Sequence, residues 1–175
     1  SMRLATLRTE TGTSAARIVS DSEAVLLPFE DVGALLAQEN WQELSLVDAA
    51  PTPFSPTDLA PVIPRPGKII CVGLNYAKHI EEMGHERPDV PTLFIKFPEA
   101  LIGPYDDVEV PEFNAESLDF EGELAVIVGK HARHVQDGEA YIAGYSVIND
   151  YTQRTYQKRT QQWHQGKSLE KTAGF

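Results

Sequence analysis

Alternating apolar and polar residues indicate short β-strands at the start of the chain. Three such runs, separated by Thr, Gly, Ser and Asp residues typical of turns, cover residues 2–7, 15–19 and 24–27. Val32, Leu35 and Leu36 instead have helical spacing, and Asp31 precedes them as a candidate N-cap. We therefore expect the first fifty residues to form short strands and one helix.

A proline-rich stretch follows this first region. Residues 51–67 contain six prolines, Pro51, Pro53, Pro56, Pro61, Pro64 and Pro66. Because proline lacks a backbone donor, such a stretch cannot form a regular helix or a central strand. It predicts a linker, with a small α/β domain over residues 1–60 and a second domain over residues 61–175. The alternative is a long surface loop within one domain.

Beyond the prolines, the pattern predicts mainly β-structure with short helices. Expected strands cover residues 68–72, 92–96, 108–110, 118–128 and 141–148, and an expected helix covers residues 76–83. The strands and helices do not alternate regularly, as they would in a Rossmann sheet. The predicted fold class is therefore α+β, dominated by strands.

The run Leu118–Val128 carries the clearest candidate chemistry. In a strand, Asp119, Glu121 and Glu123 share one face, and the opposite face consists of apolar residues and a glycine, so we expect that opposite face to be core. Neighbouring carboxylates repel unless a cation lies between them, and oxygen ligands favour a hard ion. Asp150 follows another apolar run. The alternatives are a solvated acidic face at Leu118–Val128 and a turn-forming role for Asp150.

Histidine and lysine residues supply further candidates. His79 and Glu82 lie three residues apart on the predicted helix, where a carboxylate can orient an imidazole that acts as a base. An incidental surface pair would have the same spacing. Lys96 and Lys167 could each hold a substrate carboxylate or face solvent. The remaining histidines are expected at the surface: His85, His131, His134 and His164.

The charge balance limits the classes of partner. The formal charge is 15 − 26 = −11, which argues against nucleic acid or an anionic membrane but not against a small anionic substrate. We find no apolar window of signal-peptide or membrane-span length. Cys71 lies in an apolar run and is expected to be a buried, inert thiol, which fits a reducing cytoplasm.

The order of these segments resembles the fumarylacetoacetate hydrolase family. The resemblance extends from about Pro66 to Phe175, and the preceding segment is similar to the small N-terminal domain of many bacterial members. The segments that carry it are 66–76, His79 with Glu82, 94–96, 118–124, Asn149-Asp150 and Gly166-Lys167-Ser168. The resemblance implies a mixed β-sandwich roll with short helices, usually assembled as a homodimer.

The resemblance also implies roles for individual residues. Glu121, Glu123 and Asp150 match three carboxylates that bind Mg²⁺ or Mn²⁺, with Ca²⁺ as a substitute in crystals. His79 and Glu82 match a pair that activates water. Lys96 and Lys167 match lysines that contact the substrate, with Lys167 assigned to the catalytic group, and Arg154 and Gln157 are further substrate-binding candidates.

From the resemblance we expect a metal-dependent hydrolase that cleaves a carbon–carbon bond in small 2,4-diketo acids, similar to an acylpyruvase or fumarylpyruvate hydrolase. The alternatives are an isomerase or decarboxylase of 2-oxo dicarboxylic acids, and an inactive metal-binding or dimerisation fragment. Two departures bear on this choice. Residues 153–157 replace two positions of the usual Ala-Arg-Asp-x-Gln motif, and relatives continue with further strands beyond the position of Phe175.

Overall fold

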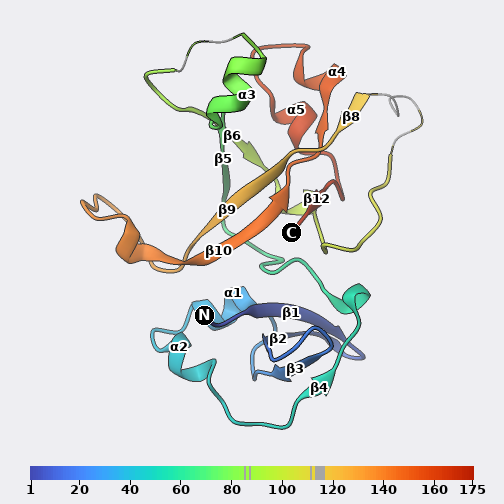
Figure 1. The fold of residues 1–175 in the computed structure, drawn as a ribbon, viewed down its shortest axis with the longest axis vertical. Coiled ribbons are helices and arrows are strands. Elements are labelled where there is room, and N and C mark those ends of the chain that lie inside the picture. Colours follow the sequence, from blue (N-terminus) through green and yellow to red (C-terminus); the bar gives the residue numbers. More distant parts are fainter. Residues whose placement is uncertain (85, 87, 111, 113–116) are drawn as a thin grey trace.

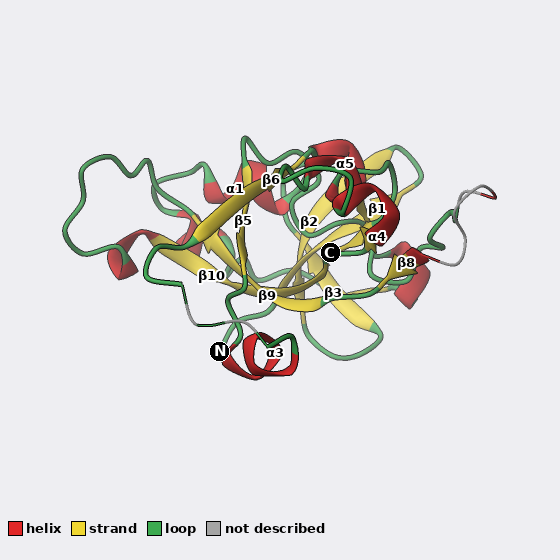
Figure 2. Ribbon diagram, turned by 90° about the horizontal axis from the view of Figure 1, so that it is seen from above, coloured by secondary structure: helices red, strands yellow, loops and turns green. Residues whose placement is uncertain are grey.

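The computed structural model describes residues 1–84, 86, 88–110, 112 and 117–175. The chain forms two β-rich parts, one below the other in Figure 1, joined by a segment near residue 60. Strands and loops dominate and the helices are short (Figure 2). This mixed α+β, mainly β architecture confirms the predicted fold class.

The N-terminal part is a four-stranded antiparallel sheet in the order β1-β2-β3-β4. Its strands are β1 (Leu4–Thr9), β2 (Gly12–Ile18), β3 (Glu23–Leu26) and β4 (Thr52–Pro53). Gly12 begins β2 with φ of 142°, a backbone conformation that residues with a side chain rarely adopt. The three strands predicted before residue 50 are therefore confirmed, with small shifts at their ends.

Helix α1 (Val32–Leu36) covers this sheet and completes its core. The Asp31 side chain caps it by accepting a hydrogen bond from the Ala34 amide at 2.7 Å, as predicted. Its apolar side chains pack with strand residues in one buried cluster, Ala15, Val25, Leu27, Val32, Leu35 and Leu36. A second helix, α2 (Trp41–Leu44), was not predicted, because four residues are too few to establish a helical period.

The proline-rich stretch contains two short elements, β4 and a 3₁₀ helix (Pro56–Asp58). Proline fits β4 because this strand lies at the sheet edge, where one backbone donor can be missing without breaking a central ladder. After it, Val62 and Ile63 pack against the N-terminal core.

The C-terminal part is built from two antiparallel ribbons. The first pairs β5 (Ile69–Gly73) with β6 (Thr92–Lys96), with α3 (Ala77–Glu82) between them along the chain. The second pairs β9 (Gly122–Val128) with β10 (Ile142–Asn149). Shorter elements lie between these strands or follow β10: β7 (Leu101–Ile102), β8 (Leu118–Asp119), β11 (Thr152–Gln153), α4 (Arg154–Gln157), α5 (His164–Lys167), β12 (Ala173–Gly174) and 3₁₀ turns at Pro98–Ala100 and Glu139–Tyr141.

Three predictions for this part were wrong. Val108–Val110 is not a strand. The predicted strand Leu118–Val128 is interrupted at residues 120 and 121, where β8 ends and β9 has not begun. Its expected core face is exposed, with Leu124 60% and Phe120 71% accessible, whereas Glu123 lies on the more buried face. Period-two alternation identifies which residues share a face, but it does not identify which face is covered.

Polar contacts join the two parts. Arg8 of β1 forms an ion pair with Asp106 at 2.6 Å, and Thr6 Oγ1 donates to the carbonyl of Val62, in the connecting stretch, at 2.7 Å. Burial alone would raise the pKa of Asp106, but the Arg8 guanidinium and the Gly103 amide outweigh burial and lower it. These contacts fix the N-terminal sheet against the part that carries the candidate site.

The remaining histidines and the lengths of the helices also bear on predictions from the sequence. His131, His134 and His164 are exposed, as predicted, and His85 lies outside the described residues. Over the part of the chain that the structure describes, no helix has both the length and the apolar character needed to cross a membrane.

Candidate active site

The interruption between β8 and β9 brings Glu121 and Asp150 together. The β9–β10 ladder ends with Gly122 opposite Asn149, and a separate ladder pairs β8 with β11. Between the ladders, the Asp150 amide donates to the Glu121 carbonyl at 2.8 Å, and the Glu121 amide donates to Asn149 Oδ1 at 3.0 Å. The backbone is therefore fixed where the two carboxylates meet.

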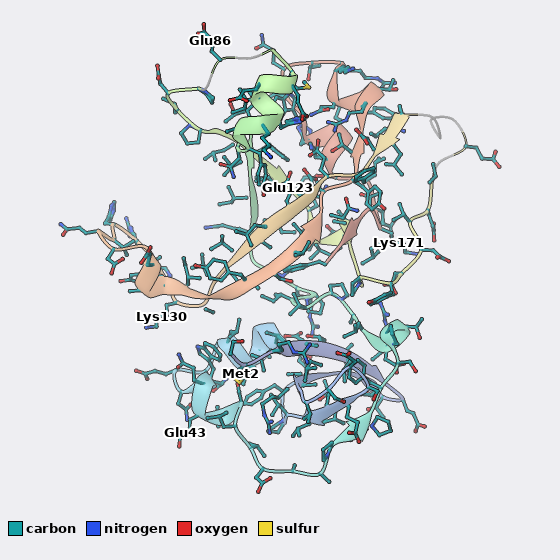
Figure 3. The ribbon with its side chains drawn as sticks, viewed as in Figure 1. Met2, Glu43, Glu86, Glu123, Lys130 and Lys171 are labelled. Atoms are coloured by element: carbon teal, nitrogen blue, oxygen red, sulfur yellow. The ribbon has the colours of Figure 1, made fainter. Side chains whose placement is uncertain are left out.

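Glu121, Glu123 and Asp150 form a compact cluster of carboxylates. One oxygen from each side chain lies within 4.8 Å of the others. Asp150 is 1% exposed and the two glutamates are partly buried. Glu123 lies near the start of β9, close to α5 (Figure 3). Such an all-oxygen set suits a hard divalent ion such as Mg²⁺, Mn²⁺ or Ca²⁺.

Two buried lysines contact this cluster. Lys167, at the end of α5, donates to Glu121 Oε2 at 2.7 Å and to Asp150 Oδ2 at 2.8 Å. Lys96, at the end of β6, donates to Asp150 Oδ1 at 2.6 Å and to the Lys167 carbonyl. Both oxygens of Asp150 therefore have a lysine partner. A buried charge is tolerated only when it is paired in this way.

Arg154 also neutralises the cluster. Its guanidinium contacts Glu121 Oε1 at 2.5 Å and Asp119 Oδ2 at 3.0 Å, and it donates to Gln157 Oε1 at 2.9 Å. Burial would lower the pKa of Arg154, but Glu121 and Asp119 outweigh burial and raise it. Arg154 and Gln157 thus lie beside the acidic cluster, and their substrate-binding role stays a prediction.

The two glutamates differ in their affinity for a proton. Burial would raise the pKa of Glu121, but Lys167 and Arg154 outweigh burial and hold it below its usual value. Burial, the charges of Asp150 and Glu121, and a hydrogen bond to Glu121 raise the pKa of Glu123 to about 7. Glu123 is therefore the carboxylate that the lysines and Arg154 neutralise least, and a divalent ion would supply the missing positive charge.

His79 and Glu82 lie on α3, outside this network. The predicted helix is confirmed, but both side chains are exposed, and among the contacts of the described residues no hydrogen bond or ion pair joins them. Tyr76, the residue before α3, ties the helix to the acidic strand because its hydroxyl accepts a hydrogen bond from the Leu124 amide at 3.1 Å. The water-activating role of the pair stays a prediction.

Several roles in the site were not predicted from sequence. Asn149 and Asp119 were noted only as part of a family segment and of an acidic face, whereas in the structure Asn149 fixes the Glu121 backbone and Asp119 pairs with Arg154. Trp163 packs against Gly73, where a Cβ atom would lie 2.4 Å from the indole ring. The position of Asn149 directly before Asp150 was the one sequence signal for its role. Contacts between distant segments leave no periodic pattern in the sequence.

Cys71 also borders the cluster. Its thiol is half-buried, and burial followed by the charge of Asp150 raises its pKa to about 12. A thiol with this pKa stays protonated near neutral pH and is a poor nucleophile. This agrees with the inert role predicted for Cys71.

Residues 68–175 match the family model described as the C-terminal part of fumarylacetoacetate (FAA) hydrolase. The chain belongs to the fumarylacetoacetate hydrolase family. This confirms the resemblance seen in the sequence and the fold that it implied. Members of this family commonly use a divalent metal, and Glu121, Glu123 and Asp150 form a cluster able to bind one.

Relatives within the fumarylacetoacetate hydrolase family include tautomerases. The mitochondrial oxaloacetate tautomerase Fahd2a of Rattus norvegicus is 43% identical over 129 residues, covering 70% of this chain and 41% of the relative. The oxaloacetate tautomerase YisK of Bacillus subtilis is 44% identical over 115 residues, covering 63% of this chain and 38% of the relative. The chain thus spans about two fifths of the length of these curated relatives.

Solved structures show the same fold. Fumarylacetoacetate hydrolase from Exiguobacterium antarcticum has a TM-score of 0.81 and 29% identity, covering 100% of this chain and 65% of that protein. The 2-hydroxyhepta-2,4-diene-1,7-dioate isomerase of Mycobacterium marinum has a TM-score of 0.76 and 26% identity, covering 99% of this chain and 64% of that protein. The similarity includes the N-terminal sheet, since nearly the whole chain aligns with both.

Proposed function

We propose that this protein is a divalent-metal-dependent isomerase that interconverts the keto and enol forms of a small 2-oxo dicarboxylic acid. The observation that carries the proposal is the cluster of Glu121, Glu123 and Asp150 with two buried lysines, in a chain related to oxaloacetate tautomerases. This differs from the carbon–carbon hydrolase expected from sequence. The named activities of the curated relatives favour isomerisation.

The cluster provides the residues that would hold the ion. Glu121, Glu123 and Asp150 offer carboxylate oxygens, and burial, followed by the charges of Asp150 and Glu121, raises the pKa of Glu123. When bound, the ion would polarise the oxo and enol oxygens of the substrate. The ion is proposed to be Mg²⁺ or Mn²⁺ because oxygen ligands suit both.

The cations of the site suit an anionic substrate. Lys167 is positioned to stabilise negative charge that develops on a substrate oxygen, because its ammonium is already held beside the carboxylates. Arg154 and Gln157, which hydrogen-bond to each other at 2.9 Å, are the candidates for binding a substrate carboxylate. This set favours a dicarboxylate over a neutral substrate.

Keto–enol exchange requires only the transfer of a proton. A C–H bond next to the oxo group breaks and an O–H bond forms, so the substrate keeps every carbon atom. His79 is proposed to carry this proton from its exposed position on α3, with Glu82 nearby on the same helix. Hydrolysis would in addition need a water molecule held and activated by an oriented pair, and among the contacts of the described residues His79 and Glu82 share no hydrogen bond.

Hydrolysis of a 2,4-diketo acid remains the second candidate. It is favoured by the similarity of the whole chain to the Exiguobacterium hydrolase, with a TM-score of 0.81. The same carboxylates and lysines would serve that reaction, since both reactions place negative charge on an enol oxygen. A cytoplasmic location and a homodimer stay predictions.

Enol loss and product analysis together distinguish the two functions. The protein with Mn²⁺ is given the enol form of oxaloacetate, and the enol absorbance is followed beside a metal-free control. We expect Mn²⁺-dependent loss of the enol with all carbon recovered as oxaloacetate by NMR. Cleavage of an acylpyruvate without acceleration of enol loss would reject the isomerase and support the hydrolase.

A further inference from the structure

Lys96 is the most buried cation of the candidate site. The residue is 2% exposed and its side chain is 0% exposed. Removing an ammonium group from water costs several kcal/mol, so the acceptors around it must supply a comparable stabilisation. The groups that accept hydrogen bonds from the Lys96 ammonium therefore indicate its role in the site.

Two protein groups accept hydrogen bonds from Lys96. Its ammonium donates to Asp150 Oδ1 at 2.6 Å and to the carbonyl of Lys167. The other Asp150 oxygen accepts from the Lys167 ammonium at 2.8 Å. Among the contacts of the described residues, Lys96 has no ion pair with Glu121 or Glu123. Lys96 thus connects one carboxylate of the cluster to the backbone of α5.

Strand β6 supports this connection. Phe94 lies two residues before Lys96 and therefore on the same face of the strand. Its ring lies 5.1 Å from the Lys167 ammonium and packs edge-on against Trp163 at 5.7 Å. The inner face of β6 therefore holds α5 through Phe94 and through Lys96.

We propose that Lys96 is a positioning residue, which fixes Asp150 and the end of α5 and does not bind substrate. The inference rests on the metal-dependent function proposed above. With one oxygen of Asp150 held by Lys96, the second oxygen and the Lys167 ammonium have a defined orientation toward the cluster. Residues that hold metal-binding carboxylates in place are typically worth 10–100-fold in metal affinity.

The test replaces Lys96 with Met, which has a similar length and no charge. Mn²⁺ affinity is measured by calorimetry for wild type, Lys96→Met and the control Lys68→Met, in which an exposed lysine just before β5 is changed. We expect affinity to fall about 10–100-fold in Lys96→Met and to stay unchanged in Lys68→Met. At saturating Mn²⁺, we expect kcat for oxaloacetate enol to fall while KM stays near the wild-type value.

Each contrary outcome has a distinct meaning. If Lys96→Met binds Mn²⁺ as wild type does but has a raised KM, Lys96 binds substrate and the positioning role is wrong. If wild type itself binds no Mn²⁺, the proposed function fails as well. Circular dichroism establishes that the variant is folded. If it is not, Lys96→Gln, which is uncharged but keeps a donor group, is measured in its place. A loss of Mn²⁺ affinity in that variant supports the inference, and wild-type Mn²⁺ affinity overturns it.

Discussion

The interior of the N-terminal sheet and the interior around the candidate site are stabilised differently. In the first, most buried side chains are apolar, with Leu35 0% and Val25 2% exposed, beside a few polar ones such as Thr6. In the second, the largest fully buried side chains include Lys167, Gln153 and Asp150. Apolar packing tolerates many substitutions of similar volume, whereas a buried ion pair depends on each partner. The C-terminal part therefore has charged side chains in its interior where the N-terminal part has mainly apolar ones.

The apolar surface follows the same division. On β9, Leu124, Val126 and Val128 are 60%, 50% and 61% exposed, and on β10 Tyr145 and Val147 are 64% and 71% exposed. The apolar residues of the N-terminal strands lie in two buried clusters, one packed by α1 and the other by Phe54 and Leu59. Loss of a buried apolar side chain should therefore destabilise the N-terminal part more, and loss of a buried charged side chain should destabilise the C-terminal part more.

The largest effect is expected for Asp150→Ala. This change leaves the ammonium groups of Lys96 and Lys167 buried without their shared partner, so unfolding free energy should fall by about 3–5 kcal/mol. Asp119→Ala is the control, because Asp119 is 50% exposed and pairs with Arg154 at the surface, where the cost should stay below about 1 kcal/mol. Urea unfolding measures both. Equal losses would contradict the contrast between buried and exposed pairs.

A smaller effect is expected for Leu35→Ala. Leu35 is fully buried in the N-terminal core, so its truncation should cost about 2–4 kcal/mol through lost burial and a residual cavity. Leu124→Ala removes the same atoms from an exposed position and should change stability by about 0.5 kcal/mol or less. The comparison uses the same urea titration. A large cost at Leu124 would mean that the β9 face is covered in solution.

Gly73→Ala tests the contact that holds the Trp163 segment against β5. A Cβ atom at Gly73 would lie 2.4 Å from the Trp163 ring, so the indole must shift, at a cost of about 1–3 kcal/mol. Gly67→Ala is the matched control, because no atom lies within 4 Å of the position its Cβ would take. Tryptophan fluorescence should change in the first variant and not in the second. An unchanged spectrum in Gly73→Ala would show that Trp163 does not pack there.

The smallest effect is expected for Glu123→Gln in metal-free buffer. The pKa of Glu123 is raised from its ordinary value of 4.5 to about 7 in the folded protein. Between pH 4.5 and pH 7 the folded state therefore binds more protons than the unfolded state. This group therefore lowers stability as pH rises from 4.5 to 7, and the penalty is complete above 7. The shift corresponds to at most about 3 kcal/mol, and solvent screening at this partly exposed carboxyl reduces it, so the variant should be about 1 kcal/mol more stable than wild type at pH 8 and equal to it at pH 4. Thermal unfolding at both pH values tests this, and an equal difference at both would refute it.

The sequence predicted the elements better than their environment. Asp31 and the spacing of Val32, Leu35 and Leu36 indicated the first helix correctly, because a cap and a helical period are local signals. The face of Leu118–Val128 that carries Leu124 was assigned to the core and is exposed, because burial depends on what packs against a strand.

The candidate site was predictable in part. The family resemblance selected Glu121, Glu123 and Asp150, which spacing alone left as either a metal site or a solvated surface, and the structure brings the three together. The partners of Lys96 and Lys167 could not be predicted, since each contact joins residues far apart in the chain. Such contacts are set by the ladder register and by the break at residues 120 and 121.

The most direct test of the account is Mn²⁺ binding by calorimetry, comparing wild type with the double variant Glu121→Gln/Glu123→Gln. Both changes keep the shape of the side chains and remove their charge. We expect one Mn²⁺ per chain in wild type and no measurable binding in the double variant. Absence of binding in wild type, or equal binding in both proteins, would contradict the claim that these carboxylates form the metal site.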